Sequence, residues 1–257
     1  MASDPSVLNL LEFALDAAWQ AGRITLAHFQ TGVKTNRKSD NTPVTVADQQ
    51  AEQKIRQLIS EYWPDHGIIG EEYGQSSSKS SFTWIIDPID GTKSFVSGVP
   101  LYSTLMALTD GAKALIGIAH FPALGETIYA VRGGGCFWDG RRAHVSKVDN
   151  LSDAVILTSG LNYFGNKMAA WQRLVDNTYT QRTWGDAYGY FLVATGRAEI
   201  MLDPAMHIWD SAPFQVILEE AGGTFTDWLG NPTIHAYESV ATNRVLFEQV
   251  MSVIRED

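Results

Sequence analysis

Two aspartates and a Gly-Thr pair follow one short apolar run, in the stretch WIIDPIDGTKSFVSG at residues 84–98. Asp87 ends the apolar run, Asp90 comes three residues later, and Gly91 and Thr92 follow directly. A buried strand that delivers acids into a turn at its end is a common site geometry in α/β proteins. Two carboxylates beside free backbone amides in one turn indicate a site for a metal-bound phosphate.

The chemistry of this turn supports that prediction but leaves an alternative. Pro88 fixes one φ angle and removes a backbone donor, which stiffens the turn. Gly91 lets the backbone approach a ligand closely, and the amides of Gly91, Thr92 and Lys93 are then donors for an anion. The sequence Asp-Pro-x-Asp-Gly is also ordinary turn chemistry, in which Asp caps the turn and Gly takes a positive φ. Acids elsewhere in the chain decide between the two interpretations.

Two further acids stand at similar junctions between apolar segments and turns. Glu71 follows GIIG at 67–70, and Asp210 ends HIWD at the start of a predicted helix. Taken singly, Asp210 is explained as a helix cap and Glu71 as a loop acid. If the four acids converge, each pair at 4 Å repels by about 4 kcal/mol at an effective dielectric constant of 20. Lys93 is the one cation near them in the sequence, so a converging group requires bound cations.

The types of the remaining residues narrow the choice of cation. Ligands that are all oxygen suit Mg²⁺ or Mn²⁺ better than zinc. The histidines stand at positions 28, 66, 120, 144, 207 and 235, and they show no zinc-binding spacing. We therefore expect a magnesium or manganese site.

Hydrophobic patterning predicts the elements that position these acids. A helix is expected over residues 6–30, and a second one begins at the capping pair Thr45 and Asp48 and ends at Pro64. Further helices are expected over 167–177, 187–195, 209–221 and 244–254. Strands are expected at 67–72, 84–87, 103–109, 113–121, 126–131, 154–158, 197–202 and 239–242, with a tight hairpin at Asp110-Gly111. This mixture of hairpins and crossover helices implies a layered α/β or α+β fold.

Composition excludes several classes of function. The chain has 257 residues and a formal net charge of -10, which argues against non-specific binding to nucleic acid. Its single cysteine, Cys136, fits a reducing compartment and is better explained as a small buried residue than as a reactive thiol. No apolar run approaches the roughly 18 residues that span a bilayer. Without a basic, apolar leader in MASDPSVLNL, we expect a cytoplasmic protein without membrane partners, or an organellar one if a targeting segment was removed.

Three motifs together resemble one family. GEE at 70–72, DPIDGT at 87–92 and WDSAPFQVILEEAGG at 209–223 resemble the inositol monophosphatase superfamily, and the resemblance covers nearly the whole chain. It implies a Mg²⁺-dependent phosphatase, a layered αβαβα sandwich and a homodimer. We expect one domain over residues 1–257, with most metal ligands before about residue 150 and the substrate-selecting residues in 151–257.

The resemblance also implies roles for single residues. Glu71, Asp87 and the carbonyl of Ile89 would bind one ion, and Asp87, Asp90 and Asp210 a second; two or three Mg²⁺ ions are expected, with Mn²⁺ as a substitute. Asp48, Thr92 and Glu71 form the implied catalytic group, in which the Thr92 hydroxyl, paired with Asp48, orients the attacking water. The amides of Gly91 and Thr92 would hold the phosphate during in-line attack by a metal-activated water.

The C-terminal half resembles the histidinol-phosphatase branch in RTWGDAYGYFLVATGRAEIMLDP and in DGTKSFVSGVPLY. Histidinol carries an amine and an imidazole that titrates near neutrality, so extra acids in its pocket would favour it over the uncharged inositol. Asp186, Asp203 and Glu199 are the predicted substrate residues. The alternative roles are a helix cap for Asp186 and an outward-facing strand acid for Glu199.

Members of the histidinol-phosphatase branch often carry Arg where this chain has Ser97, and the loss of that Arg would weaken or shift specificity. Two alternative functions remain open. One is an inositol-1-phosphate or broad sugar-phosphate monophosphatase, and the other is a non-catalytic regulator that binds metal or phosphate. The polar segment Thr35 to Pro43 is expected to be an exposed loop and the lid of the site, since it precedes Asp48.

Overall fold

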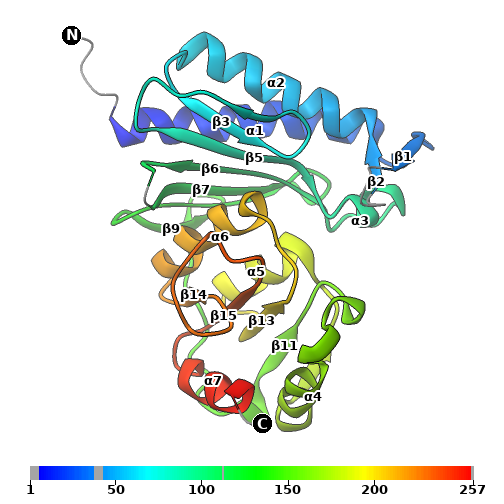
Figure 1. Cartoon of the computed structure of the whole chain (residues 1–257), viewed down its shortest axis with the longest axis vertical. Coiled ribbons are helices and arrows are strands. Elements are labelled where there is room, and N and C mark those ends of the chain that lie inside the picture. The colour runs from blue at the N-terminus through cyan, green and yellow to red at the C-terminus, as the bar shows by residue number, and fades with distance from the viewer. Residues whose placement is uncertain (1–5, 38–42, 112, 256–257) are drawn as a thin grey trace.

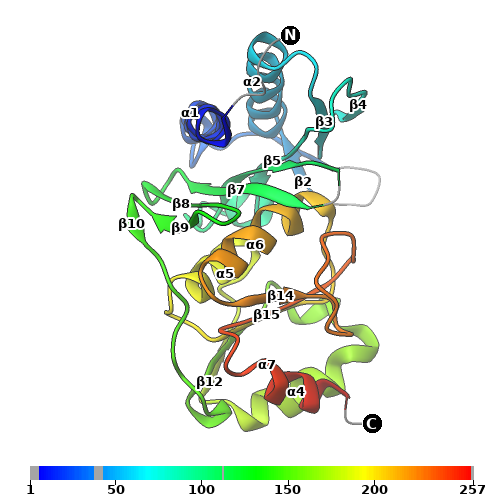
Figure 2. The same cartoon turned by 90° about the vertical axis from the view of Figure 1, so that its left-hand side faces the viewer.

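The computed structural model describes residues 6–37, 43–111 and 113–255. Three helical layers and two β-sheets alternate along the long axis of the molecule (Figures 1 and 2). Helices α1 (Val7–His28) and α2 (Val46–Tyr62) form the first layer, and α5 (Asp186–Ala194) and α6 (Ile208–Glu220) lie between the sheets. Helices α4 (Met168–Asn177) and α7 (Phe247–Arg255) form the last layer. This α–β–α–β–α order confirms the predicted sandwich.

The first helical layer packs through small side chains. Ala14, Ala18 and Ala21 of α1 are fully buried, and their size lets the helix lie close to the first sheet. Helix α2 begins at the predicted capping box: the Thr45 hydroxyl accepts a hydrogen bond from the Ala47 amide at 3.1 Å, and Asp48 accepts from the Thr45 amide at 2.8 Å.

The first sheet has eight strands in the order β10-β9-β8-β7-β6-β5-β3-β4. Only β3 and β5 run parallel, and Gly70 pairs with Ile86 at their ends. The residues that follow, Glu71 and Asp87, therefore leave the sheet side by side. The strands span β3 (Gly67–Gly70), β4 (Gly74–Ser76), β5 (Thr83–Asp90), β6 (Ser103–Thr109), β7 (Ala114–Phe121), β8 (Glu126–Val131), β9 (Gly135–Trp138) and β10 (Arg141–Arg142).

The middle layer is buried because a sheet covers it above and below. Every residue of α6 from Ser211 to Leu218 is buried. The helix crosses β7 at Gly117, where a Cβ atom would overlap the carbonyl oxygen of Pro213. This close approach fixes the start of α6, which carries Asp210, against the first sheet.

The second sheet has five strands in the order β12-β11-β13-β15-β14. Strands β11 (Val155–Leu157), β12 (Thr180–Arg182) and β13 (Ile200–Asp203) are parallel, whereas β14 (Thr224–Thr226) and β15 (Ser239–Thr242) complete the sheet in antiparallel pairing. Because β11 and β13 are parallel neighbours, their carboxyl ends meet at one edge. Trp171 and Leu174 of α4 and Met251 of α7 belong to the core that packs below this sheet.

The remaining elements are short. Helix α3 (Thr92–Val96) follows the central turn, and β1 (Thr35–Arg37) pairs with β2 (Pro43–Thr45). The other short helices, of the 3₁₀ type, are η1 (Leu151–Asp153), η2 (Leu161–Tyr163) and η3 (Gly165–Lys167). The expectation of a loop from Thr35 to Pro43 is therefore wrong at both ends, where a two-stranded ladder forms. The middle of this segment, residues 38–42, lies outside the described residues, and the predicted role of the segment as a lid stays a prediction.

The long predicted helices and strands are confirmed, and the errors concern short strands. The Ser-rich loop expected from Gln75 to Ser81 begins with β4, and the strands β9, β10, β12 and β14 were not predicted. Cys136 is fully buried, and burial raises the pKa of its thiol to about 12, which confirms it as an unreactive core residue. Within the described ranges, no helix combines the length and apolarity that crossing a membrane requires.

Candidate active site

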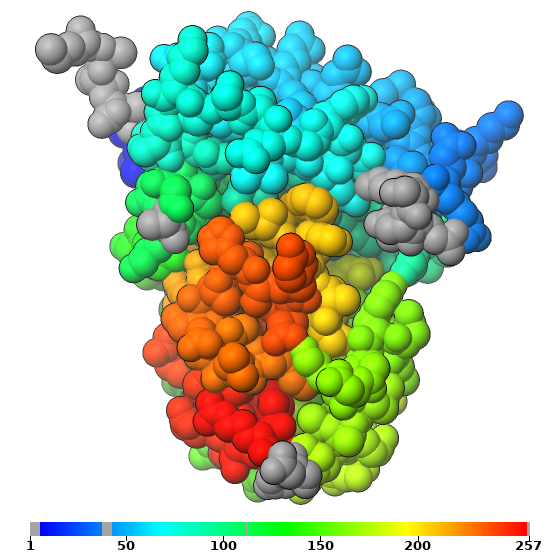
Figure 3. All heavy atoms as spheres, in the orientation of Figure 1, coloured from blue at the N-terminus to red at the C-terminus, as the bar shows by residue number. Residues whose placement is uncertain are grey.

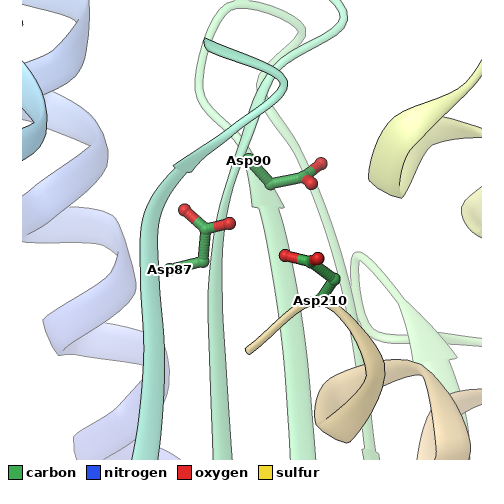
Figure 4. Close-up of side chains that lie close together, drawn as sticks. All are labelled: Asp87, Asp90 and Asp210. Carbon is green, nitrogen blue, oxygen red and sulfur yellow. The ribbon is translucent and has the colours of Figure 1, made fainter. Parts of the chain in front are cut away.

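The carboxyl groups of Asp87, Asp90 and Asp210 point into one space between the end of β5 and the start of α6 (Figure 4). One oxygen from each lies within 4.8 Å of the others. A regular strand would send Asp87 and Asp90 to opposite faces, because they are three residues apart. The pairing of β5 with β6 shifts between Asp87 and Asp90, and this bulge turns both carboxylates toward the same side.

The bulged turn is held by its own hydrogen bonds. Asp87 accepts one from the Ile89 amide at 3.0 Å, and the Thr104 hydroxyl donates to the Pro88 carbonyl at 2.9 Å. The Thr92 hydroxyl donates to the Ile89 carbonyl at 3.0 Å. Gly91 has a φ of 78°, a left-handed conformation that favours glycine, and it begins α3. The turn thus has both the ordinary turn chemistry and the acid geometry that the sequence predicts.

Asp210 combines two functions that the sequence offered as alternatives. It lies in the first turn of α6 and accepts a hydrogen bond from the His207 amide at 2.7 Å, which caps the helix. It also lines the same cavity as Asp87 and Asp90. The cap therefore fixes the carboxylate in the site.

Glu71 reaches this group from the parallel neighbour of β5. Its amide donates to the Ile86 carbonyl at 3.2 Å, and its side chain shares a hydrogen bond with Asp87. The turn after Glu71 is tied down by Glu52, which accepts from the Glu72 amide at 2.7 Å. A Cβ atom at Gly70 would overlap the Glu52 carboxylate, so a larger residue there would displace Glu52.

These acids raise one another's pKa. Burial raises the pKa of Asp87 well above its ordinary value, and the charges of Glu71 and Asp90 raise it further. Burial and the charges of Asp186 and Asp210 do the same to the pKa of Asp90. For Asp210, burial raises the pKa to about 7, with a contribution from Glu71. In the part of the chain that the structure describes, no lysine or arginine pairs with Asp87, Asp90 or Asp210.

The donor set fits a hard divalent cation. Carboxyl oxygens of Asp87, Asp90 and Asp210 lie within 4.8 Å of one another, and burial together with mutual repulsion raises the pKa of each group. A divalent cation would compete with protons for these carboxylates and offset both the burial and the repulsion. The acids line a cavity of about 150 Å³ together with Ile89, Gly91, Thr92 and Lys93.

Asp48 lies beside this cavity but does not line it. It is buried, and one of its oxygens accepts from the Thr45 amide and hydroxyl at 2.8 and 2.7 Å. Its other oxygen, Oδ1, is buried without a hydrogen-bond partner. Burial raises the pKa of Asp48, and the charge of Glu71 adds a smaller contribution. The Thr92 hydroxyl bonds to Ile89, so the predicted pair of Asp48 and Thr92 is not formed in this structure.

A second cavity of about 120 Å³ adjoins the first and shares Asp90, Asp186 and Asp210 with it. Asp203, the last residue of β13, lines its inner part. Burial raises the pKa of Asp186 to about 6, although nearby Lys93 lowers it, and burial raises that of Asp203 to about 7. The structure thus brings two of the three predicted substrate residues together.

Glu199 is not part of either cavity. It precedes β13, at the opposite end of that strand from Asp203, and its carboxylate accepts a hydrogen bond from the Val155 amide at 2.7 Å. Only 5% of the residue is exposed, so the outward-facing alternative is also wrong. Ser97 lies at the exposed C-terminal end of α3 and lines neither cavity.

Several site residues were given no role from the sequence, and two of them, Ser159 and Tyr163, lie outside every motif quoted above. Tyr163 lies in η2, where its hydroxyl and ring contact the Lys93 ammonium, and it lines the second cavity. Ser159 and Tyr190 donate hydrogen bonds to Asp203 at 2.8 and 2.9 Å. The side chains of His207 and Trp209 stack with ring centroids 4.8 Å apart at the rim of the first cavity. Figure 3 shows the surface hollowed where the blue-to-cyan N-terminal layers meet the gold and green segments below.

A cluster of acids that could hold a divalent cation, on a layered α/β scaffold, fits a metal-dependent hydrolase. Residues 7–257 match the profile of the inositol monophosphatase family. The chain belongs to this family of metal-dependent phosphoric monoester hydrolases.

Individual relatives support this assignment. The chain is 40% identical to a histidinol-phosphatase of Chlorobaculum parvum over 248 residues, 95% of this chain and 96% of the relative. It is 34% identical to a histidinol-phosphatase of Mycobacterium tuberculosis over 254 residues, 94% of this chain and 96% of that one. Among solved structures, a Thermotoga maritima IMPase superposes with a TM-score of 0.87 at 30% identity, covering 96% of both chains.

Proposed function

We propose that this protein is a magnesium-dependent phosphatase that hydrolyses L-histidinol phosphate to L-histidinol and phosphate, a reaction of histidine biosynthesis. The observation that carries the proposal is the second cavity, where Asp186 and Asp203 adjoin the acids that fit a cation. A cationic alcohol would meet two carboxylates there. The similarity to two histidinol-phosphatases along most of the chain supports the same substrate.

We assign the metal-binding roles to the converging acids. Glu71, Asp87 and the Ile89 carbonyl would hold one ion, and Asp87, Asp90 and Asp210 a second; two or three Mg²⁺ ions fit this set, with Mn²⁺ as a substitute. When bound, these ions neutralise the phosphate and lower the pKa of water.

The chain itself positions the ester and the water. The first amides of a helix have no intrahelical partner, so those of Gly91 and Thr92 would bind phosphate oxygens. The Thr92 hydroxyl donates to Ile89, which leaves its oxygen as an acceptor for a proton of the attacking water. Asp48, with one buried and unpartnered oxygen, would accept the Thr92 proton after rotation of the hydroxyl. Glu71 would complete this catalytic group.

One observation favours a second substrate class. Lys93 lies close enough to Asp186 to lower its pKa, and so it offsets part of the negative charge of the second cavity. The second cavity would then favour a cationic alcohol over a neutral polyol by a smaller difference in binding affinity. An inositol-1-phosphate or sugar-phosphate monophosphatase is therefore the alternative, and a non-catalytic regulator is the alternative of another class. We also expect a cytoplasmic homodimer that binds neither nucleic acid nor membranes, and sedimentation tests the dimer.

The deciding measurement is phosphate release with Mg²⁺, comparing L-histidinol phosphate and inositol 1-phosphate at equal concentrations. A strong preference for histidinol phosphate supports the proposal. Preference for inositol phosphate would assign the chain to the alternative substrate class. If neither ester releases phosphate at any Mg²⁺ concentration of a titration, the result would favour the non-catalytic regulator.

A further inference from the structure

Ser159 links the two carboxylates of the second cavity. It lies two residues beyond β11, at the edge where the parallel strands β11 and β13 both end. Its amide donates to Asp203 Oδ1 at 3.0 Å and its hydroxyl donates to Asp203 Oδ2 at 2.8 Å. These two bonds fix the plane of the Asp203 carboxylate.

The same hydroxyl holds the start of α5. The Asp186 amide donates to Ser159 Oγ at 2.8 Å. Asp186 has a φ of 52°, a left-handed conformation that is strained for any residue with a Cβ atom. The backbone of Gly185, just before Asp186, packs closely against Ser159: a Cβ atom at Gly185 would overlap the Ser159 Cα atom. Ser159 thus stabilises the strained turn that directs the Asp186 side chain.

The other side of this turn is fastened to the first cavity. The next amide, that of Ala187, donates to Asp90 Oδ2 at 2.7 Å. The Asp186 carboxylate lies near the central turn, since a Cβ atom at Gly91 would stand 3.1 Å from Asp186 Oδ2. Ser159 and Asp90 therefore hold two successive amides of α5, and the Asp186 side chain lies between the phosphate turn and the second cavity.

Serine chemistry is needed for this arrangement. The hydroxyl donates to Asp203 and accepts from Asp186 at once, a combination that alanine cannot provide and cysteine provides weakly. Asp203 keeps another donor, the Tyr190 hydroxyl at 2.9 Å, when the serine hydroxyl is removed. The Asp186 amide has no such substitute. Loss of the hydroxyl should therefore move Asp186 relative to Asp203 while both carboxylates remain.

We propose that Ser159 is a positioning residue that sets the separation of the Asp186 and Asp203 carboxylates and thereby selects the alcohol part of the substrate. This inference rests on one part of the proposed function, namely that the second cavity binds the alcohol part of the phosphate ester. Among the described residues, the hydrogen bonds of Ser159 go to Asp203 and Asp186 and not to the acids assigned to the metal. Its influence is therefore on ester selection and not on the hydrolysis of any ester.

The test compares Ser159→Ala, Ser159→Cys and Ser159→Thr on two esters with saturating Mg²⁺. One ester is L-histidinol phosphate, and the other is p-nitrophenyl phosphate, whose alcohol offers no hydrogen-bond donor to a carboxylate. We expect Ser159→Ala to raise KM for histidinol phosphate about tenfold with a smaller change in kcat, and to leave KM for the nitrophenyl ester within about twofold. Ser159→Thr keeps the hydroxyl and should restore the KM, and Ser159→Cys, which keeps the size, should resemble Ser159→Ala.

The matched control is Thr224→Val, which removes a hydroxyl that pairs with Thr242 at 2.8 Å in the same sheet, away from both cavities. Its KM for both esters should equal that of the wild type. A second measurement combines Ser159→Ala with Asp186→Asn: if Ser159 acts through Asp186, its effect on KM disappears in the Asp186→Asn protein.

Equal losses on both esters, an unchanged KM, or full additivity with Asp186→Asn would overturn the proposal. If the wild type prefers another ester to histidinol phosphate, the proposed function fails separately. The Ser159 comparison is then made with the preferred ester, and the loss must still be selective against p-nitrophenyl phosphate.

Discussion

The two adjoining cavities of the site are built in different ways. In the first, Asp87 and Asp90 come from one bulged strand end, and Glu71 comes from the strand paired beside it. In the second, Ser159 is 27 residues from Asp186 and 44 residues from Asp203, and the three meet because β11 and β13 end, and α5 begins, at one edge. Local sequence thus determines most of the first cavity, whereas tertiary structure assembles the second.

The electrostatics of the two cavities differ in the same way. The acids of the first cavity are buried and repel one another, which raises their pKa values. In the second, Asp203 is satisfied by donors from the chain itself, namely Ser159 and Tyr190. The first cavity is therefore suited to a cation from solution, whereas the second is preorganised by the fold. Changes in the first should alter metal dependence, and changes in the second should alter ester preference.

The largest effect is expected from Asp210→Asn. The amide keeps an oxygen that can accept from the His207 amide, so the helix cap survives, but one negative charge of the cation site is lost. Because even partners outside a metal's ligand set typically cost 10–100-fold, we expect kcat/KM to fall by more than about a hundredfold on every ester. The measurement is phosphate release across a Mg²⁺ titration. An unchanged Mg²⁺ dependence would remove Asp210 from the metal site.

The pH dependence of stability tests the repulsion in the first cavity. The pKa values of Asp87, Asp90 and Asp210 are raised in the folded state, so that state binds more protons than the unfolded chain. This contribution to stability is fully present below the unfolded value of 3.8 and is lost as pH rises through the folded value, about 7 for Asp210. In chelator, we expect Tm to fall by about 5 °C or more between pH 5.5 and 8.

Magnesium supplies the control for that experiment. A cation that binds the carboxylates of the first cavity should raise Tm much more at pH 8 than at pH 5.5, because it competes with protons for them. Asp210→Asn should flatten the pH dependence in chelator. An equal Mg²⁺ effect at both pH values would contradict the assignment of the cation to these acids.

The difference between the cavities also explains what the sequence could predict. The apolar run before Asp87, the Thr45 and Asp48 capping pair and the glycines after α6 have local causes, so these features follow from pattern alone. Ser159 and Tyr163 carry no such pattern, and their roles depend on which strand ends and short helices meet. The Asp48 and Thr92 pair depends on side-chain rotation, which spacing does not determine.

Asp186→Asn tests the charge of the second cavity. Asparagine adopts the left-handed backbone of this position readily, so the turn at the start of α5 should be kept. If the carboxylate binds a cationic alcohol, kcat/KM for histidinol phosphate should fall about thirtyfold, and that for a neutral ester should change only a few-fold. Steady-state kinetics on both esters is the measurement, with the exposed Asp153→Asn as the matched change of charge. Equal losses on the two esters would show that Asp186 does not select for charge.

Glu199 defines the limit of the second cavity and carries the smallest expected effect on activity. The sequence pattern put it with Asp186 and Asp203, but it lies at the far end of β13, and four strand residues span about 13 Å. Its carboxylate instead accepts the Val155 amide, and its backbone carbonyl accepts the Asn243 amide at 3.0 Å. It therefore joins β11 to the segment after β15.

Glu199→Gln keeps an acceptor for Val155 but loses the charge that strengthens that bond. We expect a loss of about 1 kcal/mol in the free energy of unfolding, a larger loss of about 2 kcal/mol for Glu199→Ala, and KM for histidinol phosphate within about twofold of wild type for both. Urea unfolding and steady-state kinetics measure the two quantities on the same preparations. If kcat/KM for histidinol phosphate fell as it is expected to fall in Asp186→Asn, the alcohol pocket would extend along β13. The site would then have a third, deeper region besides the first cavity, which local sequence determines, and the second, which tertiary structure assembles.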